Sequence, residues 1–340
     1  MGTDEDPSRR AVRMSCPQAD EREWPAVDVV MPVRNEVDTL RPAVRSILEQ
    51  EYPGTIRILL GMAPSDDGTE TVADELAADG VVVVPNAEST ISCGLNRAIR
   101  AGNAPIIVRV DAHSELAPGY VRRAVEVLAE TGAGNVGGRQ VPVPRSRFES
   151  AVAAATSSWL GTGGAAYRTG TSAGAVDTVY LGVFDRQAIE EIGLYDEEMI
   201  RNEDYELNIR LRQAGHVVWF DPELEVRYRP RSSFRELARQ YFDYGTWKAE
   251  VLRQHPRSVR LRQLLPPLAV VGSAAGLLAA ARKPLAAVVP LGYLGLVAVG
   301  AGRSSGEGGR VRVAAVAVVI HWTWAAGLLR GVVAVRRRVR

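Results

Sequence analysis

Short apolar runs and amphipathic segments alternate along the first two thirds of the chain. The runs are rich in Val, Ile and Leu, which favour strands, and the segments between them carry apolar residues at helical spacing. Strands are predicted at 26–32, 56–60, 81–84, 106–110, 179–184 and 217–220, and helices at 40–48, 72–77, 95–101, 120–128 and 196–213. This alternation predicts an α/β fold, in which helices flank a mainly parallel sheet.

The last third of the chain contains three uncharged apolar runs. They cover residues 264–281, 284–302 and 313–329, and short basic stretches separate them. Each run approaches the ~20 residues that cross a bilayer. The pattern favours two or three membrane-anchoring helices over a buried helical subdomain. Pro266 and Pro267 shorten the first run, which could instead lie in the membrane interface.

Charge is distributed unevenly between these two parts. The whole chain has a formal net charge of +1, but residues 251–340 contain 14 Arg or Lys and a single acid. The first 250 residues are therefore acidic and have no general attraction for nucleic acid, whereas the basic tail attracts anions. With the N-terminal part in the cytoplasm, three spans would leave the Arg-rich tail outside, against the positive-inside rule, and two spans would return it.

The ends and the cysteines complete the domain prediction. Residues 1–24 are polar and predict a disordered leader without a signal peptide. Cys16 and Cys93 are too few for a disulfide framework and fit a reducing compartment, and we expect Cys93 to be a packed side chain. The sequence thus predicts an α/β domain over 25–255 and membrane helices with a basic tail over 256–340.

The first candidate for chemistry is the segment that follows the strand at 106–110. Asp111 and His113 lie two residues apart there, directly after Arg109 and Val110. Ligands of open α/β sheets bind at the carboxyl ends of strands. A carboxylate and an imidazole at this edge could hold a divalent cation, which could in turn hold a diphosphate. The alternative is a pair of solvated loop residues.

A second candidate is the acidic pair at the start of the helix predicted over 196–213. The helix macrodipole favours the charged form of Asp204, and Glu203 beside it would raise its pKa, which suits a general base. The alternative is helix capping by Asn202 or Asp204. Arg109 likewise has two open roles, as a positive charge beside phosphates or as the partner of a structural acid. The common glycine-rich phosphate-binding motifs are absent from the sequence.

Six segments follow one another in a fixed order along the chain. They are VVMPVRNE (29–36), GLNRAI (94–99), VRVDAHSEL (108–116), VDTVYLGVF (176–184), GLYDEEMIRNEDYELNIRLRQAG (193–215) and RQYFDYGTWK (239–248). Taken in this order, they resemble the family 2 inverting glycosyltransferases, most closely the succinoglycan-type branch that adds sugars to lipid-linked carriers. The similarity runs from about Val27 to Lys248, and the apolar tail also fits that branch.

The resemblance implies a GT-A fold, a nucleotide-diphosphate sugar donor and Mn²⁺ or Mg²⁺ at Asp111, with His113 as a second ligand or as an orienting residue. By position, Asp204 matches the catalytic base, and Glu203 beside it could contact the acceptor. The residues implied to bind the nucleotide sugar are Pro32, Arg34, Glu36, Asp67, Arg109 and Asp111, and those implied to close over donor and acceptor are Gln240, Tyr244 and Trp247.

The chain departs from the family pattern at two places. The usual Asp-x-Asp is Asp111-x-His113, as in the succinoglycan-type branch. The usual acidic pair after the second strand is replaced by Met62-Ala63, so that only Asp67 of that pattern remains and the nucleobase is left open.

Several further segments allow two interpretations. Tyr241, Tyr244 and Trp247 could form an aromatic platform for a sugar or an isoprenoid, or positions 241, 244 and 248 could form a buried helix stripe. Residues 161–174, rich in Gly, Ser and Thr, fit a mobile loop over the site or a plain linker. His321, within the last apolar run, is either functional or a hydrogen-bonded packing residue.

Together, these features predict a membrane-anchored inverting, metal-dependent glycosyltransferase that acts on a lipid-linked or polysaccharide acceptor in cell-surface glycan biosynthesis. We expect a multi-pass protein of the cell membrane with a cytoplasmic catalytic domain, and other glycan-assembly proteins as partners. The alternatives are a polysaccharide synthase, which generally needs more membrane helices, and a non-catalytic adaptor, which would have no need of Asp111, Glu203 and Asp204 together.

Overall fold

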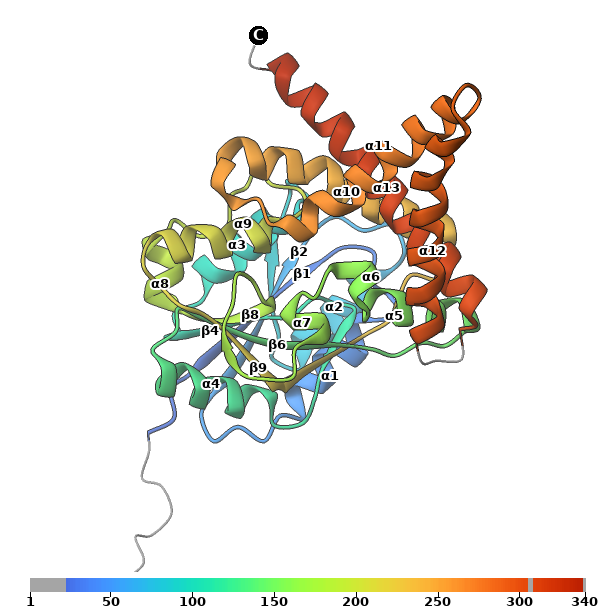
Figure 1. The fold of residues 1–340 in the computed structure, drawn as a ribbon. Helices are drawn as coiled ribbons and strands as arrows, with labels where there is room; N and C mark the ends of the chain where they lie inside the picture. The colour runs from blue at the N-terminus through green and yellow to red at the C-terminus, as the bar shows by residue number, and fades with distance from the viewer. Residues whose placement is uncertain (1–22, 305–307, 339–340) are drawn as a thin grey trace, which may run out of the picture.

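A mixed nine-stranded sheet forms the centre of the protein (Figure 1). The computed structural model describes residues 23–304 and 308–338, so most of the leader predicted over 1–24 lies outside the described residues. The ring of Trp24 already packs edge-on against Tyr52, with centroids 5.5 Å apart. The sheet order is β3-β2-β1-β4-β8-β6-β9-β5, with β7 paired to β9.

The first half of the sheet is parallel, as the alternating pattern predicts. The four strands are β1 (Val27–Val33), β2 (Ile56–Met62), β3 (Val82–Pro85) and β4 (Ile106–Arg109), connected by α1 (Leu40–Leu48), α2 (Thr69–Ala78) and α3 (Ile91–Ala101). Because the strands run in one direction, their carboxyl ends meet along one edge. The loops after β1, β2 and β4 therefore lie together at this edge.

The second half of the sheet reverses direction. Strand β8 pairs antiparallel with both β4 and β6, and β9 pairs parallel with β6. The elements are β5 (Ser114–Leu116), α4 (Tyr120–Thr131), β6 (Asn135–Pro142), α5 (Arg147–Thr156), β7 (Gly174–Ala175), β8 (Tyr180–Asp185), α8 (Arg186–Glu191), α9 (Glu203–Gln213), β9 (Val218–Tyr228) and α10 (Phe234–Gln254). The pattern of hydrophobic residues did not indicate β6, whose centre is Gly137-Gly138 and lacks side chains.

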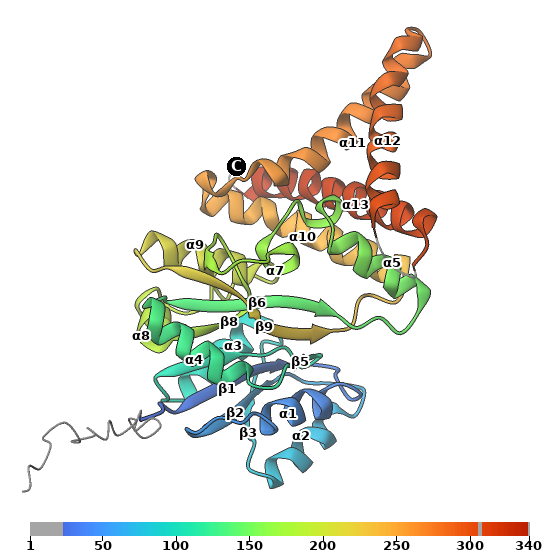
Figure 2. The ribbon, with the colours of Figure 1, turned by 60° about the horizontal axis from the view of Figure 1, so that its bottom comes forward.

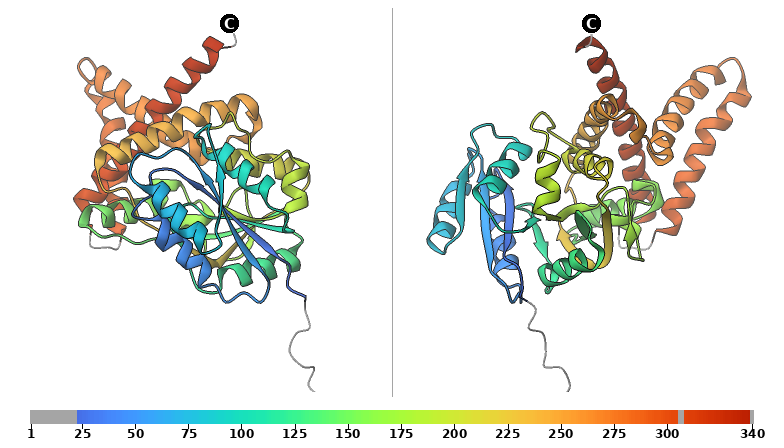
Figure 3. Two further views of the ribbon diagram at one scale, coloured as in Figure 1. Left: turned by 180° about the vertical axis from the view of Figure 1, so that it is seen from behind. Right: turned by 90° about the vertical axis from the view of Figure 1, so that its left-hand side faces the viewer.

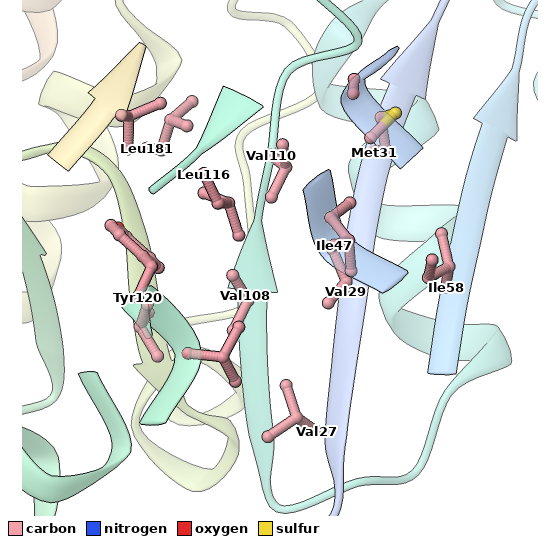
Figure 4. Close-up of a cluster of buried hydrophobic side chains, with 14 of the residues drawn as sticks. Val27, Val29, Met31, Ile47, Ile58, Val108, Val110, Leu116, Tyr120 and Leu181 are labelled. Carbon is pink, nitrogen blue, oxygen red and sulfur yellow. The ribbon is translucent and has the colours of Figure 1, made fainter. Parts of the chain in front are cut away.

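Apolar side chains cover both faces of the sheet. Val27, Val29 and Met31 of β1 point into the cluster shown in Figure 4, together with Ile47 of α1 and residues of β2 and β4. Val30 points the other way, into a second cluster with α3 and α9. The alternation of side chains along β1 thus contributes to a core layer on each face of the sheet. It also fixes the face toward which each side chain at the ends of β1 and β4 points.

Two sequence-based predictions about local structure were wrong. The helix predicted over 196–213 begins only at Glu203, because Asn202 has a φ of 63° and this left-handed conformation cannot continue a helix. The segment 161–174 is not one long loop. It contains the end of α6 (Trp159–Thr162) and all of α7 (Ala166–Thr169), and Gly161 packs so closely on the backbone of α5 that a side chain would not fit.

The C-terminal part consists of three helices long and apolar enough to cross a membrane. They are α11 (Leu261–Ala280), α12 (Val288–Arg303) and α13 (Arg310–Arg338), with short 3₁₀ turns at Pro256–Ser258 and Pro284–Ala287. The two prolines expected to shorten the first run lie inside α11. Helices α11 and α12 form a hairpin that projects from the protein, whereas α13 runs beside α10 (Figures 2 and 3).

Candidate active site

Arg109 joins the two candidate acidic segments. It is the last residue of β4 and is 4% exposed. Its Nε and Nη2 atoms each lie 3.2 Å from Oδ1 of Asp111, and Nη2 also donates to Oε1 of Glu203 at 2.9 Å. The fold thereby brings the end of β4 and the start of α9 to one place. Arg109 thus pairs with acids, and these acids are predicted site residues.

The cation of Arg109 is buried among acidic groups. Burial alone would lower the pKa of the guanidinium, but the charge of Asp111 and its other acidic neighbours outweighs burial and raises it. The guanidinium carbon lies 5.6 Å from the ring centre of Tyr195. Its Nη1 atom is buried and has no hydrogen-bond partner within the described ranges 23–304 and 308–338. An anion bound at this site would provide an acceptor for that atom.

Asp204 has the electrostatic environment expected of a general base. Burial, followed by the nearby charge of Glu203, raises its pKa to about 6, and Arg109 opposes the rise. Its Oδ1 accepts a hydrogen bond from the Tyr205 amide at 2.7 Å. Asn202, not Asp204, occupies the cap position, and it makes no side-chain cap bond. Asp204 is therefore a partly buried first-turn carboxylate whose pKa is raised to about 6.

His113 is oriented by a carboxylate from another loop. Its Nδ1 atom lies 2.9 Å from Oε1 of Glu36. Burial opposes protonation, but the hydrogen bond to Glu36 and the charge of Asp111 raise the pKa of the imidazole. Histidines that bind metals commonly have their other ring nitrogen held by a carboxylate in this way.

Asp111 and His113 fit a metal site that has few protein ligands. Among the described residues, no three His, Cys, Asp or Glu side chains are grouped as a cation site. Asp111 and His113 alone could supply two ligands from adjacent positions. Mg²⁺ and similar hard cations are often held by one or two protein ligands, with phosphate oxygens and water completing the shell. The residues present thus fit a cation that binds together with a diphosphate.

The loops after β1 and β2 are tied together beside this centre. The backbone N–H of Glu36 donates to Thr69 Oγ1 at 2.7 Å, and that of Val37 donates to Asp67 Oδ2 at 3.2 Å. Pro32 lies near the end of β1, and Arg34 is exposed in the loop that follows. The side chains at Met62 and Ala63, where the family pattern has acids, are buried and apolar. The structure thus places Pro32, Arg34, Glu36 and Asp67 along one edge.

Helix α10 meets the start of α9 through Tyr244. The Asn202 side-chain amide donates to the Tyr244 carbonyl at 3.1 Å, and Gln240 Nε2 donates to the Tyr244 hydroxyl at 3.2 Å. Tyr241 is 9% exposed and stacks edge-on against Tyr244. Trp247 packs against Met199, Ile209 and Val251. Tyr241 and Trp247 thus pack in two separate clusters, while Gln240 and Tyr244 lie near the start of α9.

Sequence reasoning missed two side chains near the site. The Tyr180 hydroxyl forms a hydrogen bond of 3.1 Å with Ser114 Oγ, in which either oxygen can be the donor. Burial raises the pKa of Tyr180, the charge of Asp111 raises it further, and the charge of Arg109 lowers it. Arg168 of α7 hydrogen-bonds to the Tyr228 hydroxyl and lies over that ring. Tyr180 lies within one of the six resembling segments, but a single tyrosine in an apolar strand does not by itself indicate a site. Arg168 lies within the segment expected to be a loop.

The comparisons with known proteins agree with this architecture. The family model described as Glycosyl transferase family 2 matches residues 28–193. The succinoglycan biosynthesis protein ExoA of Rhizobium meliloti (strain 1021) is 33% identical over 319 residues, which cover 92% of this chain and 96% of that protein. The chain belongs to glycosyl transferase family 2. The resemblance predicted from the six segments, including its succinoglycan-type branch, is therefore confirmed.

The chain also has more distant similarities, one in sequence and one in fold. A Methanococcus voltae enzyme, the dolichyl N-acetyl-alpha-D-glucosaminyl phosphate 3-beta-D-2,3-diacetamido-2,3-dideoxy-beta-D-glucuronosyltransferase, is 22% identical over 67% of this chain and 74% of its own. The mannosyltransferase PcManGT of Pyrobaculum calidifontis, solved with GDP-Man and Mn²⁺, is 18% identical. It aligns with a TM-score of 0.56 over 91% of this chain and 88% of that one. The predicted GT-A fold followed by apolar helices is confirmed.

Proposed function

We propose that this protein is a membrane-anchored inverting glycosyltransferase that moves a sugar from a nucleotide-diphosphate donor to a lipid-linked or polysaccharide acceptor. The observation that carries the proposal is the bridge formed by Arg109. It places the strand-end carboxylate Asp111 and the acidic pair Glu203-Asp204 around one buried cation. A site of this kind offers charged groups that would hold the donor diphosphate, and a basic carboxylate that would take a proton from the acceptor alcohol.

Asp204 acts as the base in this proposal. Inversion requires the acceptor hydroxyl to attack the anomeric carbon from the side opposite the leaving diphosphate, and a carboxylate oxygen of Asp204 takes the hydroxyl proton. A pKa of about 6 leaves Asp204 ionised at neutral pH and makes it more basic than an exposed aspartate. Glu203 keeps that pKa raised and could contact the acceptor.

The donor side is formed by the loops after β1, β2 and β4. Asp111 and His113 would hold Mn²⁺ or Mg²⁺, which supplies Lewis-acid neutralisation of the leaving diphosphate. Glu36 holds His113 in position, and the unpartnered Nη1 atom of Arg109 offers a donor to an anion. Pro32, Arg34 and Asp67 would line the nucleotide.

The acceptor and the location follow from the relatives and the tail. Similarity to a succinoglycan biosynthesis protein supports a role in cell-surface glycan assembly, alongside other proteins of that process. Three apolar helices support a multi-pass anchor in the cell membrane. In this proposal the catalytic domain lies on the cytoplasmic side of that membrane. Gln240, Tyr244 and Trp247 belong to the helix that would close over donor and acceptor.

The test is a donor screen on membranes that contain the protein. Release of nucleoside diphosphate is measured for a panel of nucleotide sugars, with Mn²⁺, with Mg²⁺ and with a chelator. Asp204→Asn should lower turnover by about 10²–10⁴-fold while calorimetry shows donor binding retained. Asp74→Asn, an exposed acid on α2, is the matched control. Near-normal turnover of Asp204→Asn would show that the base is another residue.

A further inference from the structure

The last apolar helix, α13, packs so closely on α10 of the catalytic domain that the backbones of the two helices are in contact. Gly327 and Gly331 of α13 lie on the carbonyl groups of Phe242 and Thr246 in α10, and a Cβ at either glycine would overlap those oxygens. Gly245 of α10 lies in the same way against the backbone of α13. Small residues spaced four apart allow two helices to approach this closely. The C-terminal half of α13 is thus fixed alongside α10.

The N-terminal half of α13 packs on α5 and α6. Val313, Val316 and Ile320 are buried in one cluster with Ala151, Val152 and Ala155 of α5. His321 Nε2 lies 2.6 Å from the Leu160 carbonyl oxygen of α6, and its Nδ1 lies 3.2 Å from the Tyr293 hydroxyl. This contact supports the packing interpretation of His321. One face of α13 therefore rests on the soluble domain along its whole apolar run.

This packing conflicts with a transmembrane position for α13. Helix α10 also carries Asp243, which the contact of Gly327 with the Phe242 carbonyl places alongside the last turns of the apolar run. Arg330 of α13 lies over the ring of Phe242, 5.4 Å from its centre. If α13 crossed the bilayer, these charged side chains would enter the hydrocarbon, where charge is costly.

The α11–α12 hairpin has the opposite environment. Leu278 is 79% exposed, Leu285 is 86% exposed and Leu291 is 64% exposed. The two helices contact each other closely, since a Cβ at Gly276 of α11 would lie 2.9 Å from Cδ of Pro290 in α12. The hairpin projects away from the catalytic domain (Figure 2). Such a surface needs an apolar surrounding that the protein itself does not supply.

We infer that α11 and α12 alone enter the bilayer, and that α13 lies in the membrane plane as part of the catalytic domain. The uncovered face of α13, with Leu329 and Val333 about half exposed, then faces the lipid. Both ends of α13 stay on the catalytic side, so the basic residues 336–338 follow the positive-inside rule. The inference rests on the proposed membrane attachment, but not on the transfer reaction.

Single-cysteine labelling tests this arrangement in the full-length protein. In a background with Cys16→Ser and Cys93→Ala, cysteines replace Arg310 and Ala334, one near each end of α13, which are both exposed. Ala87→Cys, on an exposed loop of the catalytic domain, marks the catalytic side. A membrane-impermeant maleimide is applied to right-side-out and to inverted vesicles, and the extent of labelling is compared.

If α13 lies in the membrane plane, all three cysteines should react in the same vesicle orientation. Labelling of Arg310→Cys and Ala334→Cys from opposite sides would show that α13 spans the bilayer and would overturn it. Recovery of the protein in the soluble fraction would contradict membrane attachment itself. Neither result depends on activity, so failure of the proposed transferase function is detected separately by the donor screen.

Discussion

Arg109 and Glu203, 94 residues apart in sequence, form a buried ion pair with 2.9 Å between Nη2 and Oε1. The pair connects β4, which ends just before Asp111, to helix α9, which carries Asp204. It is therefore both a structural link between the sheet and α9 and the electrostatic centre of the proposed active site.

Replacement of Arg109 should damage stability and catalysis together. Arg109→Gln leaves buried carboxylates without their cation, and we expect a loss of about 3–5 kcal/mol in the free energy of unfolding. Turnover should fall as well, because Asp111 and Glu203 lose their shared partner. Chemical denaturation and nucleoside diphosphate release measure the two effects. Arg97→Gln breaks an exposed pair with Glu88 and should change the stability little, because solvent screens an exposed ion pair. Equal effects of the two variants would contradict the role given to Arg109.

Asp204→Asn should stabilise the protein at alkaline pH. The folded-state pKa of about 6 lies above the ordinary value of 3.8, so the folded protein binds more protons than the unfolded chain between these values. The free energy of unfolding therefore falls as pH rises through that window, and ionised Asp204 destabilises the fold above it. We expect Asp204→Asn to be more stable by about 1–3 kcal/mol at pH 8 and by less at pH 5. Thermal unfolding in detergent at both pH values measures this, and a loss of stability at pH 8 would contradict it.

The same carboxylate should set the acid limb of the pH–rate profile. Below a pH of about 6, Asp204 becomes protonated and kcat/KM should fall about tenfold per pH unit. Glu203 raises the pKa of Asp204, so Glu203→Gln should move this limb to lower pH. A limb that stays in place in Glu203→Gln would show that another group controls it. Arg109 and Asp111, which also affect the pKa of Asp204, are the same in the wild-type protein and in Glu203→Gln, so the comparison reports the effect of Glu203.

Glu36→Gln tests whether His113 contributes to cation binding. If Glu36 orients His113 toward a metal, the substitution should weaken Mn²⁺ affinity about 10–100-fold. Titration of Mn²⁺ by electron paramagnetic resonance in the presence of nucleoside diphosphate measures this without turnover. Glu115→Gln, an exposed acid on β5, serves as the control. Unchanged affinity in Glu36→Gln would show that His113 does not bind the metal through this arrangement.

Substitution of glycine by alanine should have different effects on stability in α13 and in α12. Ala normally stabilises a helix interior relative to Gly by up to about 1 kcal/mol. At Gly295 of α12, a Cβ meets no described atom within 4 Å, so Gly295→Ala should be neutral or stabilising. At Gly327 the Cβ would overlap the Phe242 carbonyl, so Gly327→Ala should cost about 1–3 kcal/mol and lower turnover by displacing α10. Similar thermal stability of the two variants would mean that α13 does not hold α10.

The parallel half of the fold could be predicted closely from the sequence because its signals are local. Strands β1, β2 and β4 are short apolar runs, and each lies within two residues of its predicted bounds. Strand β6 could not be predicted, since Gly137-Gly138 lacks the side chains that the pattern relies on. Its place between β8 and β9 comes from pairing with distant strands, which periodicity does not encode.

The sequence by itself determined the residue types of the site and the α/β class, because Asp111, His113 and Asp204 lie in recognisable local contexts at element ends. It also determined that three apolar helices follow. Only the tertiary structure decided that Arg109 joins Asp111 to Glu203, that Glu36 holds His113, and that α13 lies on α10. These relationships depend on chain segments meeting across long sequence separations, where burial and backbone approach select partners that no local pattern specifies.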